Sequence, residues 1–373
     1  MHALIAIDSF KNSITSIQAN QLVARRFEAH GLATTQVAIA DGGEGTVAAW
    51  LANHAGGQSI TAQTVDLAQQ PLEATYGYFA TEKLAVIEVA AASGIQFVTA
   101  QLTPLATNTY GTGLLIKDAI KHGARKIILG LGGSGTVDGG AGILRALGYR
   151  FLDADGNELA MIGADLGKVA TIETQQVLPQ LADVTFISAA DVTNPLTGTN
   201  GAARIFGPQK GLPAAQIDAY DAALAHYMTI ASDQVSAHAG DGAAGGIGFA
   251  LRYFLHAQVQ SGFQLLADVS QLKAKVAQAD LVISGEGQVD DQSFMGKVPI
   301  QLSQMAQAAD KPCYLLVGRQ KGTNATFAEQ GVTAVLPIVD QVMTLDQAMA
   351  QGPANLERMA DRLARIISRT ARE

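Results

Sequence analysis

Acidic side chains and lysines gather in short, glycine-rich segments of this sequence. The lysines are Lys11, Lys210 and Lys297, and the acids are Asp8, Asp41, Glu44, Asp138, Asp191, Glu286, Asp290 and Asp291. Carboxylates beside such loops suit Mg²⁺, which prefers oxygen ligands and often shares them with the phosphates of a nucleotide. Lysines held between glycine or proline residues could bind phosphate oxygens or a substrate carboxylate. This combination favours phosphate chemistry assisted by a divalent cation.

Glycine is concentrated where these charged residues lie. Of the 39 glycines, 21 fall in five windows, residues 41–46, 130–142, 198–211, 240–248 and 285–287. Such clusters persist where the backbone takes a positive φ or approaches a ligand closely. Window 130–142 follows an apolar run, and its successive N–H groups before a helix predict an anion nest. We expect phosphate contacts from Gly132, Gly133, Ser134, Gly135, Thr136, Gly139 and Gly140.

The same window allows a second interpretation. Residues 130–135 satisfy G-x-G-x-x-G, and Asp153 and Asp155 follow about 20 residues later, as in a dinucleotide-binding fingerprint. Gly139 and Gly140 disfavour the helix that should begin at once. An NAD(P)-dependent oxidoreductase is therefore the alternative enzyme, and a nucleotide-binding regulator without catalysis is the alternative outside enzymes. No P-loop motif occurs, and neither histidine spacing nor the single Cys313 supports zinc.

The order of the expected elements indicates two α/β domains. Strands are expected at residues 3–7, 37–40, 59–65, 74–79, 84–89, 126–131, 184–189, 281–284, 314–317 and 335–338. A helix capped by Thr15 should end near Gly31, another should span 112–122, and a final pair should be split at Gly352-Pro353. We predict a doubly wound parallel sheet from residues 1–62 plus 272–373. An inserted mixed α/β domain, residues 63–271, would hold the antiparallel meander and the glycine-rich loop.

Composition excludes several classes of protein. Hydrophobic residues make up 48% and charged residues 16%, which excludes disorder, and the net charge of −8 argues against a nucleic-acid partner. No apolar stretch approaches the ~18 residues that span a bilayer. The single Cys313 suits a reducing compartment. We expect a soluble cytoplasmic protein with a small-molecule substrate, and homo-oligomerisation is left open. The arginines of the last helix should form a solvated face, paired locally with Glu357 and Asp361.

Taken together, the segments resemble the bacterial glycerate kinases, of the type that includes the glycerate 2-kinases. The matching segments run in order along the chain: DSFK (8–11), DGGEGT (41–46), GTG (111–113), GGSGTVDGGAG (132–142), DVTNPLTG (191–198), FGPQKG (206–211), GAAGG (242–246), SGEGQVDDQS (284–293) and GKVP (296–299). The chain differs from the family's usual pattern at Gly135, Val137, Ala190 and Thr193, and Thr193 replaces an acid. The resemblance implies ATP-dependent phosphorylation of D-glycerate, with the 2-hydroxyl favoured. It also implies a flavodoxin-like domain and an inserted α/β domain with the site in the cleft between them.

With this resemblance, roles can be assigned to the charged residues. Asp191, at the end of an apolar run, would accept the proton of the glycerate hydroxyl. Lys297 would contact phosphate, and Lys11 or Lys210 would hold the glycerate carboxylate or a transferring phosphoryl oxygen. We expect catalytic roles for Asp191, Lys297 and Lys11, substrate contacts from Lys210, Asn194 and Asp290, and Mg²⁺ held by Asp8, Asp41 and Glu44.

Overall fold

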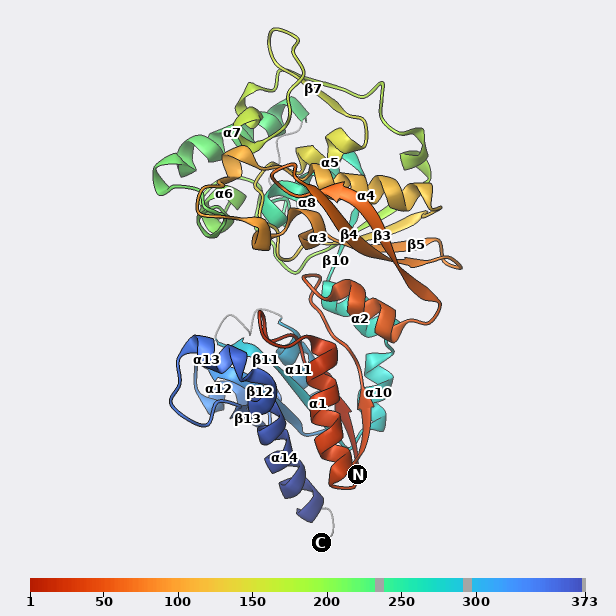
Figure 1. Cartoon of the computed structure of the whole chain (residues 1–373), viewed down its shortest axis with the longest axis vertical. Helices are drawn as coiled ribbons and strands as arrows, with labels where there is room; N and C mark the ends of the chain where they lie inside the picture. The colour runs from red at the N-terminus through yellow and green to blue at the C-terminus, as the bar shows by residue number, and fades with distance from the viewer. Residues whose placement is uncertain (232–237, 291–296, 371–373) are drawn as a thin grey trace. The chain divides into compact units, whose positions relative to one another are not determined.

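The computed structural model describes residues 1–231, 238–290 and 297–370, and the chain divides into two compact units (Figure 1). Unit 1 consists of Met1–Asp41, Ala48–Ala55 and Phe263–Glu373, and unit 2 consists of Gly42–Val47 and Gly56–Gly262. The expected boundary near residue 62 lies inside a strand, Gly57–Val65, that pairs along its whole length within unit 2. Among the described residues no helix is long and apolar enough to cross a membrane.

Unit 1 is built on a five-stranded parallel sheet in the order β13-β12-β11-β1-β2. Its strands are β1 (His2–Ile5), β2 (Ala33–Gln36), β11 (Leu281–Val289), β12 (Cys313–Gln320) and β13 (Ala334–Pro337). Renumbered within the unit, this is the 2-1-3-4-5 order of flavodoxin-like sheets, so the predicted fold class is confirmed. The strand expected at 37–40 was placed wrongly. That apolar run is buried, but the strand itself is the polar edge segment β2 just before it.

Helices cover the sheet of unit 1. Helix α1 (Ser16–Ala29) begins at Thr15, whose side chain and that of Gln18 form the expected capping box, and Gly31 follows its end with φ +80°. Apolar side chains of α1 and of α14 (Gly352–Thr370) pack with those of β1 and β11 into one core. The other helices that contribute to unit 1 are α2 (Thr46–Asn53), α9 (Gly262–Val269), α10 (Leu272–Gln278), α11 (Val298–Ala308), α12 (Asn324–Glu329) and α13 (Leu345–Ala350).

Unit 2 contains a six-stranded mixed sheet in the order β10-β9-β6-β5-β4-β3. The antiparallel meander is confirmed, because β3 (Gly57–Val65) pairs with β4 (Pro71–Phe79) and β4 pairs with β5 (Leu84–Glu88). Beyond β5 the pairing is parallel through β6 (Lys126–Gly130), β9 (Thr185–Ala189) and β10 (Gln258–Gln260). A separate hairpin joins β7 (Arg150–Leu152) to β8 (Thr171–Glu173). The parallel strands end together, so the loops that follow them lie at one edge.

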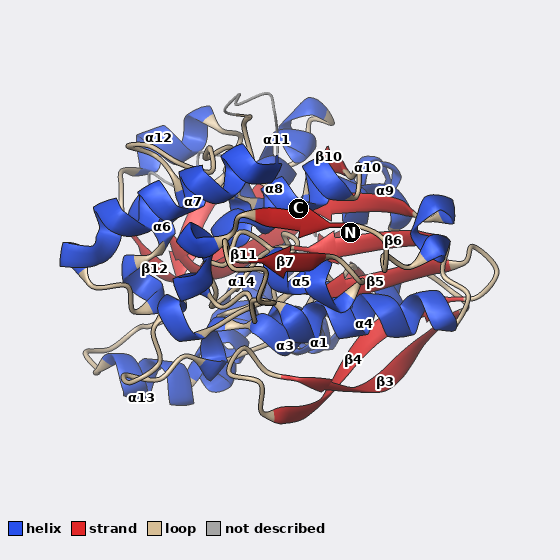
Figure 2. Ribbon diagram, turned by 90° about the horizontal axis from the view of Figure 1, so that it is seen from above, coloured by secondary structure: helices blue, strands red, loops and turns tan. Residues whose placement is uncertain are grey.

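The helices of unit 2, drawn in blue in Figure 2 together with those of unit 1, contribute to a core of mainly aliphatic side chains. They are α3 (Ala90–Ser93), α4 (Tyr110–Lys121), α5 (Ala141–Ala146), α6 (Ala202–Phe206), α7 (Ile217–Ala231) and α8 (Ala243–Phe254). The backbone of α8 is interrupted at Ala244, Gly245 and Gly246, which all have positive φ. This interruption lies directly behind the glycine-rich loop, since the Gly139 N–H donates to the Gly245 carbonyl at 3.0 Å.

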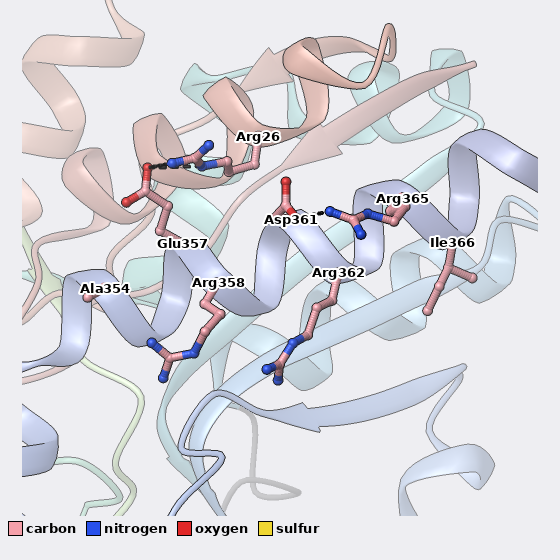
Figure 3. A pocket seen from close by; sticks show the side chains of 8 residues that line it. All are labelled: Arg26, Ala354, Glu357, Arg358, Asp361, Arg362, Arg365 and Ile366. Carbon is pink, nitrogen blue, oxygen red and sulfur yellow. Dashed lines mark hydrogen bonds and ion pairs between the residues drawn. The ribbon is translucent and has the colours of Figure 1, made fainter.

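The acids of α14 pair with side chains of α1 as well as with their own helix, and Figure 3 shows the pair between Glu357 and Arg26. Glu357 pairs with Arg26 of α1 at 2.6 Å instead of with a neighbour on its own helix. Asp361 does pair locally, with Arg365 at 3.0 Å, and the same carboxylate contacts His30 of α1 at 2.9 Å. The prediction of local partners is therefore confirmed for Asp361 and wrong for Glu357, because α1 and α14 lie side by side and the acids reach across.

Candidate functional site

The sheet of unit 1 reverses its strand order between β1 and β11, and ligands of such sheets bind at the carboxyl ends of the strands at this point. Asp8 follows β1, and its N–H donates to the Gly285 carbonyl of β11 at 2.9 Å. Glu286, the next residue of β11, is 9% exposed. The acids of the DSFK and SGEG segments therefore lie at the switch point because strand pairing places them there.

The carboxylates at this edge repel one another. Burial first, and then the charge of Asp41, raise the pKa of Asp8 to about 8, and Glu286 adds to the shift. The Ser9 N–H, which donates to Asp8 Oδ1 at 2.7 Å, and the charge of Lys11 lower the same pKa. These carboxylates therefore resist being charged together, and a bound cation would favour the ionised form of Asp8.

Two further predicted residues follow β11. Lys297 stands at the N-cap position of α11, and its Nζ lies 3.3 Å from Glu286 Oε2 with 41% of the side chain exposed. Asp290 accepts a hydrogen bond from Gln288 Nε2 at 2.8 Å. Asp291 lies outside the described residues, as does Gly296 of the GKVP segment. The acid and lysine segments of unit 1 thus meet at one sheet edge.

Unit 2 presents a second group of loops at its own sheet edge. Glu88, Gly130 and Ala189 are register partners at the ends of β5, β6 and β9. Asp191, two residues beyond Ala189, is exposed. The DGGEGT segment joins this edge, because the Gly132 N–H donates to the Gly42 carbonyl at 3.1 Å. A Cβ on Gly42 would lie 2.8 Å from the Ala189 carbonyl oxygen, so the backbones approach as closely as only glycine allows.

The glycine-rich loop exposes only its first turn. Gly133 is exposed and has φ +74°, whereas the residues from Ser134 to Gly140 are buried. Several of the expected N–H donors are already used inside the protein: the N–H of Gly135 donates to Ser93, that of Gly139 to Gly245, and that of Gly140 to the Asp138 side chain. An anion at this loop would therefore meet the turn at Gly133 and Ser134, and the later glycines serve close packing.

The chain is similar over nearly its whole length to proteins that are already known. A family model described as the glycerate kinase family matches residues 3–368. A glycerate kinase from Haemophilus influenzae is 38% identical over 99% of both chains. A glycerate 2-kinase from Escherichia coli is 38% identical over 99% of this chain and 98% of that one. This chain belongs to the glycerate kinase family. A crystal structure described as a candidate glycerate kinase 2 from Salmonella typhimurium LT2 covers 100% of both chains with a TM-score of 0.85 and 36% identity.

In this member of the glycerate kinase family, two side chains that were expected to touch substrate hydrogen-bond to loops of the protein. Lys210 is 2% exposed, and its Nζ donates to Ser134 Oγ and to the Thr136 carbonyl, both at 2.8 Å. Asn194 uses its side-chain N–H to close its own loop onto the Asn200 carbonyl at 2.9 Å. In the described geometry both side chains stabilise loops at the edge of the unit 2 sheet.

The dinucleotide fingerprint is not formed by the loop of this kinase-family chain. Helix α5 begins at Ala141, several residues after the last glycine of the fingerprint. Asp153, the acid that should bind a ribose, is instead part of a turn. Its Oδ1 accepts from the N–H groups of Asp155 at 2.9 Å and Asn157 at 2.8 Å. These bonds close a turn of the β7–β8 hairpin, which is separate from the sheet that bears the loop.

Glu88 is a site residue that the sequence analysis missed. The carboxylate of this last residue of β5 accepts the Val47 N–H at 2.7 Å, and it also bonds the N–H groups of Gly45 and Thr46. It therefore binds the DGGEGT segment at the start of α2. Burial first, with the charge of Glu44 adding to it, raises the pKa of Glu88 to about 7. The available signal was an apolar strand, LAVIE, that ends in an acid.

Replacing Glu88 with Gln should change how stability depends on pH. The folded state keeps a proton on Glu88 up to a pH of about 7, whereas the unfolded chain loses it near the ordinary pKa of 4.5. The stabilisation that this carboxyl gives to the folded state is fully present below the pKa of the unfolded chain. It is lost as the pH rises through the pKa of the folded state. Relative to the wild type, Glu88→Gln should gain roughly 2 kcal/mol between pH 5 and pH 8.

Urea unfolding at both pH values measures this difference. Glu82→Gln, an exposed change in the same unit, is the control and should show the same difference from wild type at both values. A constant difference for Glu88→Gln as well would contradict the shifted titration.

Proposed function

We propose that this protein transfers the γ-phosphoryl group of ATP to D-glycerate, with the 2-hydroxyl as the acceptor. The observation that carries the proposal is that glycine-rich and acid-bearing loops follow the carboxyl ends of the parallel strands in each unit. Phosphoryl transfer needs positioning and charge neutralisation more than covalent chemistry, and these loops offer acids, lysines and backbone N–H groups for both. Family membership supports the reaction class. The glycerate 2-kinase among the relatives supports the choice of hydroxyl.

Each residue role follows from its surroundings. Asp191 is exposed directly after a buried strand, which suits a base that must reach the glycerate hydroxyl. Lys297 and Lys11 lie beside acids of the switch point, where they can neutralise phosphate or carboxylate oxygens. The exposed turn at Gly133 and Ser134 would bind the phosphates of ATP through its backbone. Asn194 and Asp290 are proposed as further substrate contacts, with Asn194 held by its loop.

The donor set at the switch point fits Mg²⁺. Carboxylates lie close together at this edge, since the charges of Asp41 and Glu286 raise the pKa of Asp8. Mg²⁺ prefers oxygen ligands and is usually held by one or two carboxylates together with substrate phosphates. We propose that Asp8 and Asp41 hold it, with Glu44 of the same DGGEGT segment binding it or its waters. When bound, Mg²⁺ would neutralise charge on the phosphates.

A product assay tests the reaction. Protein with ATP, Mg²⁺ and D-glycerate should release ADP in proportion to phosphoglycerate, and NMR coupling of phosphorus should place it on C2. D-Lactate lacks the second hydroxyl, so its turnover should be weaker, since a site built to hydrogen-bond that group is left with unpaired partners. No ADP above background at millimolar glycerate would refute the kinase, and phosphorus on C3 would refute the choice of hydroxyl.

Ligand binding separates the kinase from its alternatives. In a thermal-shift screen, ATP with Mg²⁺ should raise the melting temperature, and NAD and NADP should leave it unchanged. An oxidoreductase would reverse this pattern, whereas a regulator would bind ATP without turning over glycerate.

Gly133→Ala should raise KM for ATP at least tenfold. A methyl group at this exposed turn would stand where the phosphates approach, at φ +74°, and the nearest atom to it among the described residues is Ala90 Cβ at 3.3 Å. Gly156→Ala is the matched control, because Gly156 has φ +83° and open space around it in the same unit. The two changes impose similar backbone strain, so a KM raised equally in both would place the phosphates elsewhere.

A further inference from the structure

Ser134 lies where the glycine-rich loop meets the segment after β5. Hydrogen bonds flank it on both sides: the Ile95 N–H donates to the Gly133 carbonyl, and the Gly135 N–H donates to the Ser93 carbonyl, each at 2.8 Å. Ser134 itself is thus the non-hydrogen-bonded partner of Gly94 in an antiparallel bridge. Its own N–H must therefore point away from the 93–95 segment.

Lys210 determines the direction of the Ser134 hydroxyl. The Lys210 ammonium donates to Ser134 Oγ at 2.8 Å, and an ammonium group can only donate. When Lys210 is charged, the hydroxyl hydrogen is therefore not donated to it and is available to another acceptor. Ser134 is 6% exposed and follows the exposed Gly133, so a ligand at this turn is within reach of that hydrogen.

The surroundings of Lys210 are built to hold it in place. Pro208–Lys210 forms a short 3-10 turn, and Gly211 leaves it with φ +90°. Burial lowers the pKa of Lys210 to about 7, while the charge of the buried Asp138 raises it. A buried lysine is costly without specific partners, and its two acceptors are both in the glycine-rich loop.

The next peptide of the loop is held in the same way from another helix. Tyr220 of α7 donates its hydroxyl to the Val137 carbonyl at 2.8 Å. Asp138 accepts from the Thr109 N–H and hydroxyl, both at 2.7 Å, and from the N–H of Gly142 at 3.1 Å. The loop is thus fixed behind its exposed turn, and Lys210 is the part of this support that reaches Ser134.

We propose that Lys210 is a positioning residue that orients Ser134, so that the Ser134 hydroxyl and N–H donate to a phosphate oxygen of the nucleotide. This inference rests on the proposed ATP-binding role of the loop. It gives Lys210 an indirect part, through Ser134 and the Thr136 peptide, in place of direct contact with substrate. It also makes Ser134 the side chain that recognises phosphate.

A double-mutant cycle tests the proposal through ADP affinity, measured by calorimetry with Mg²⁺ present. Ser134→Ala and Lys210→Met should each weaken ADP binding about tenfold, as expected for the loss of one hydrogen bond to a charged group. The double variant should bind no more than about threefold weaker than the weaker single variant, because both changes remove the same interaction. Effects that multiply to about a hundredfold would overturn the coupling.

Steady-state kinetics distinguish positioning from general damage. KM for ATP should rise about tenfold in both variants while KM for glycerate stays within twofold, since collapse of unit 2 would also disturb Asp191. Tyr227→Phe is the matched control, because the Tyr227 hydroxyl, buried in the same unit, has no hydrogen-bond partner among the described residues, so its loss should leave ADP affinity unchanged.

Failure of this proposal can be distinguished from failure of the proposed function. If Lys210→Met does not fold by circular dichroism, Ser134→Ala alone decides, and wild-type ADP affinity in that variant overturns the proposal. Equal loss of ATP and glycerate affinity overturns it as well. A wild-type protein that neither binds ADP nor phosphorylates glycerate would instead refute the proposed function itself.

Discussion

Asp191→Asn is expected to lower kcat by ~10²–10⁴ with little change in KM for ATP. Asparagine keeps the shape of the side chain but cannot accept the proton that glycerate must lose as its hydroxyl attacks phosphorus. Asp191 is exposed two residues after the buried end of β9, so the change should leave the core intact. Steady-state kinetics with saturating Mg²⁺ measure the effect.

Asp218→Asn provides the control for a lost surface carboxylate. Asp218 lies in the same unit, its side chain is 85% exposed, and it pairs only with Arg204 among the ion pairs of the described residues. Its kcat should match that of the wild type. If Asp191→Asn also turns over within a factor of a few of the wild type, the base lies elsewhere, and Asp290 is the next residue to test.

Asp8→Asn should produce the second large loss, lowering kcat by ~10² or more and raising the Mg²⁺ concentration for half-maximal activity at least tenfold. Asn lacks the charge that a divalent cation needs in its ligand. The fold should tolerate the change, since burial and Asp41 already raise the pKa of Asp8 to about 8 and so favour its neutral form without a cation. A magnesium titration of initial rates, with circular dichroism as the folding check, measures both effects.

Asp346→Asn, an exposed change on α13 in the same unit, controls for nonspecific effects of charge on magnesium dependence. An unaltered magnesium dependence in Asp8→Asn would remove Asp8 from the proposed metal site.

Much of the fold could be predicted from local pattern. The apolar runs before Asp8 and Asp191, the Thr15 cap and the closely spaced runs of the meander all correspond to elements of the structure. These signals are local, because periodicity and capping depend on residues within a few positions of each other. Edge strand β2 was missed for the same reason: its ATTQ sequence is polar, and only pairing with β1 makes it a strand.

The candidate site was less predictable, because the direction of a side chain depends on distant segments. The glycines beside Lys210 made it a candidate site residue in the sequence. Tertiary packing directs its side chain inward to Ser134 and away from solvent. Glu88 carried no motif, and its role appears only when β5 brings it to the N–H of Val47. The glycines after Gly133 looked like phosphate donors, yet their N–H groups meet carbonyls from segments such as 93 and 245.

Residue identity alone was sufficient to predict the family, the fold class and the acids, lysines and glycines of the candidate site. Motif order along nearly the whole chain is enough for this, since it depends on residue identity alone. Tertiary packing was needed to tell which of those residues are exposed at the sheet edges and which support the loops. The physical reason is that burial and hydrogen-bond partners come from strands and helices far apart in the chain, and each buried polar group must be paired wherever the fold places it.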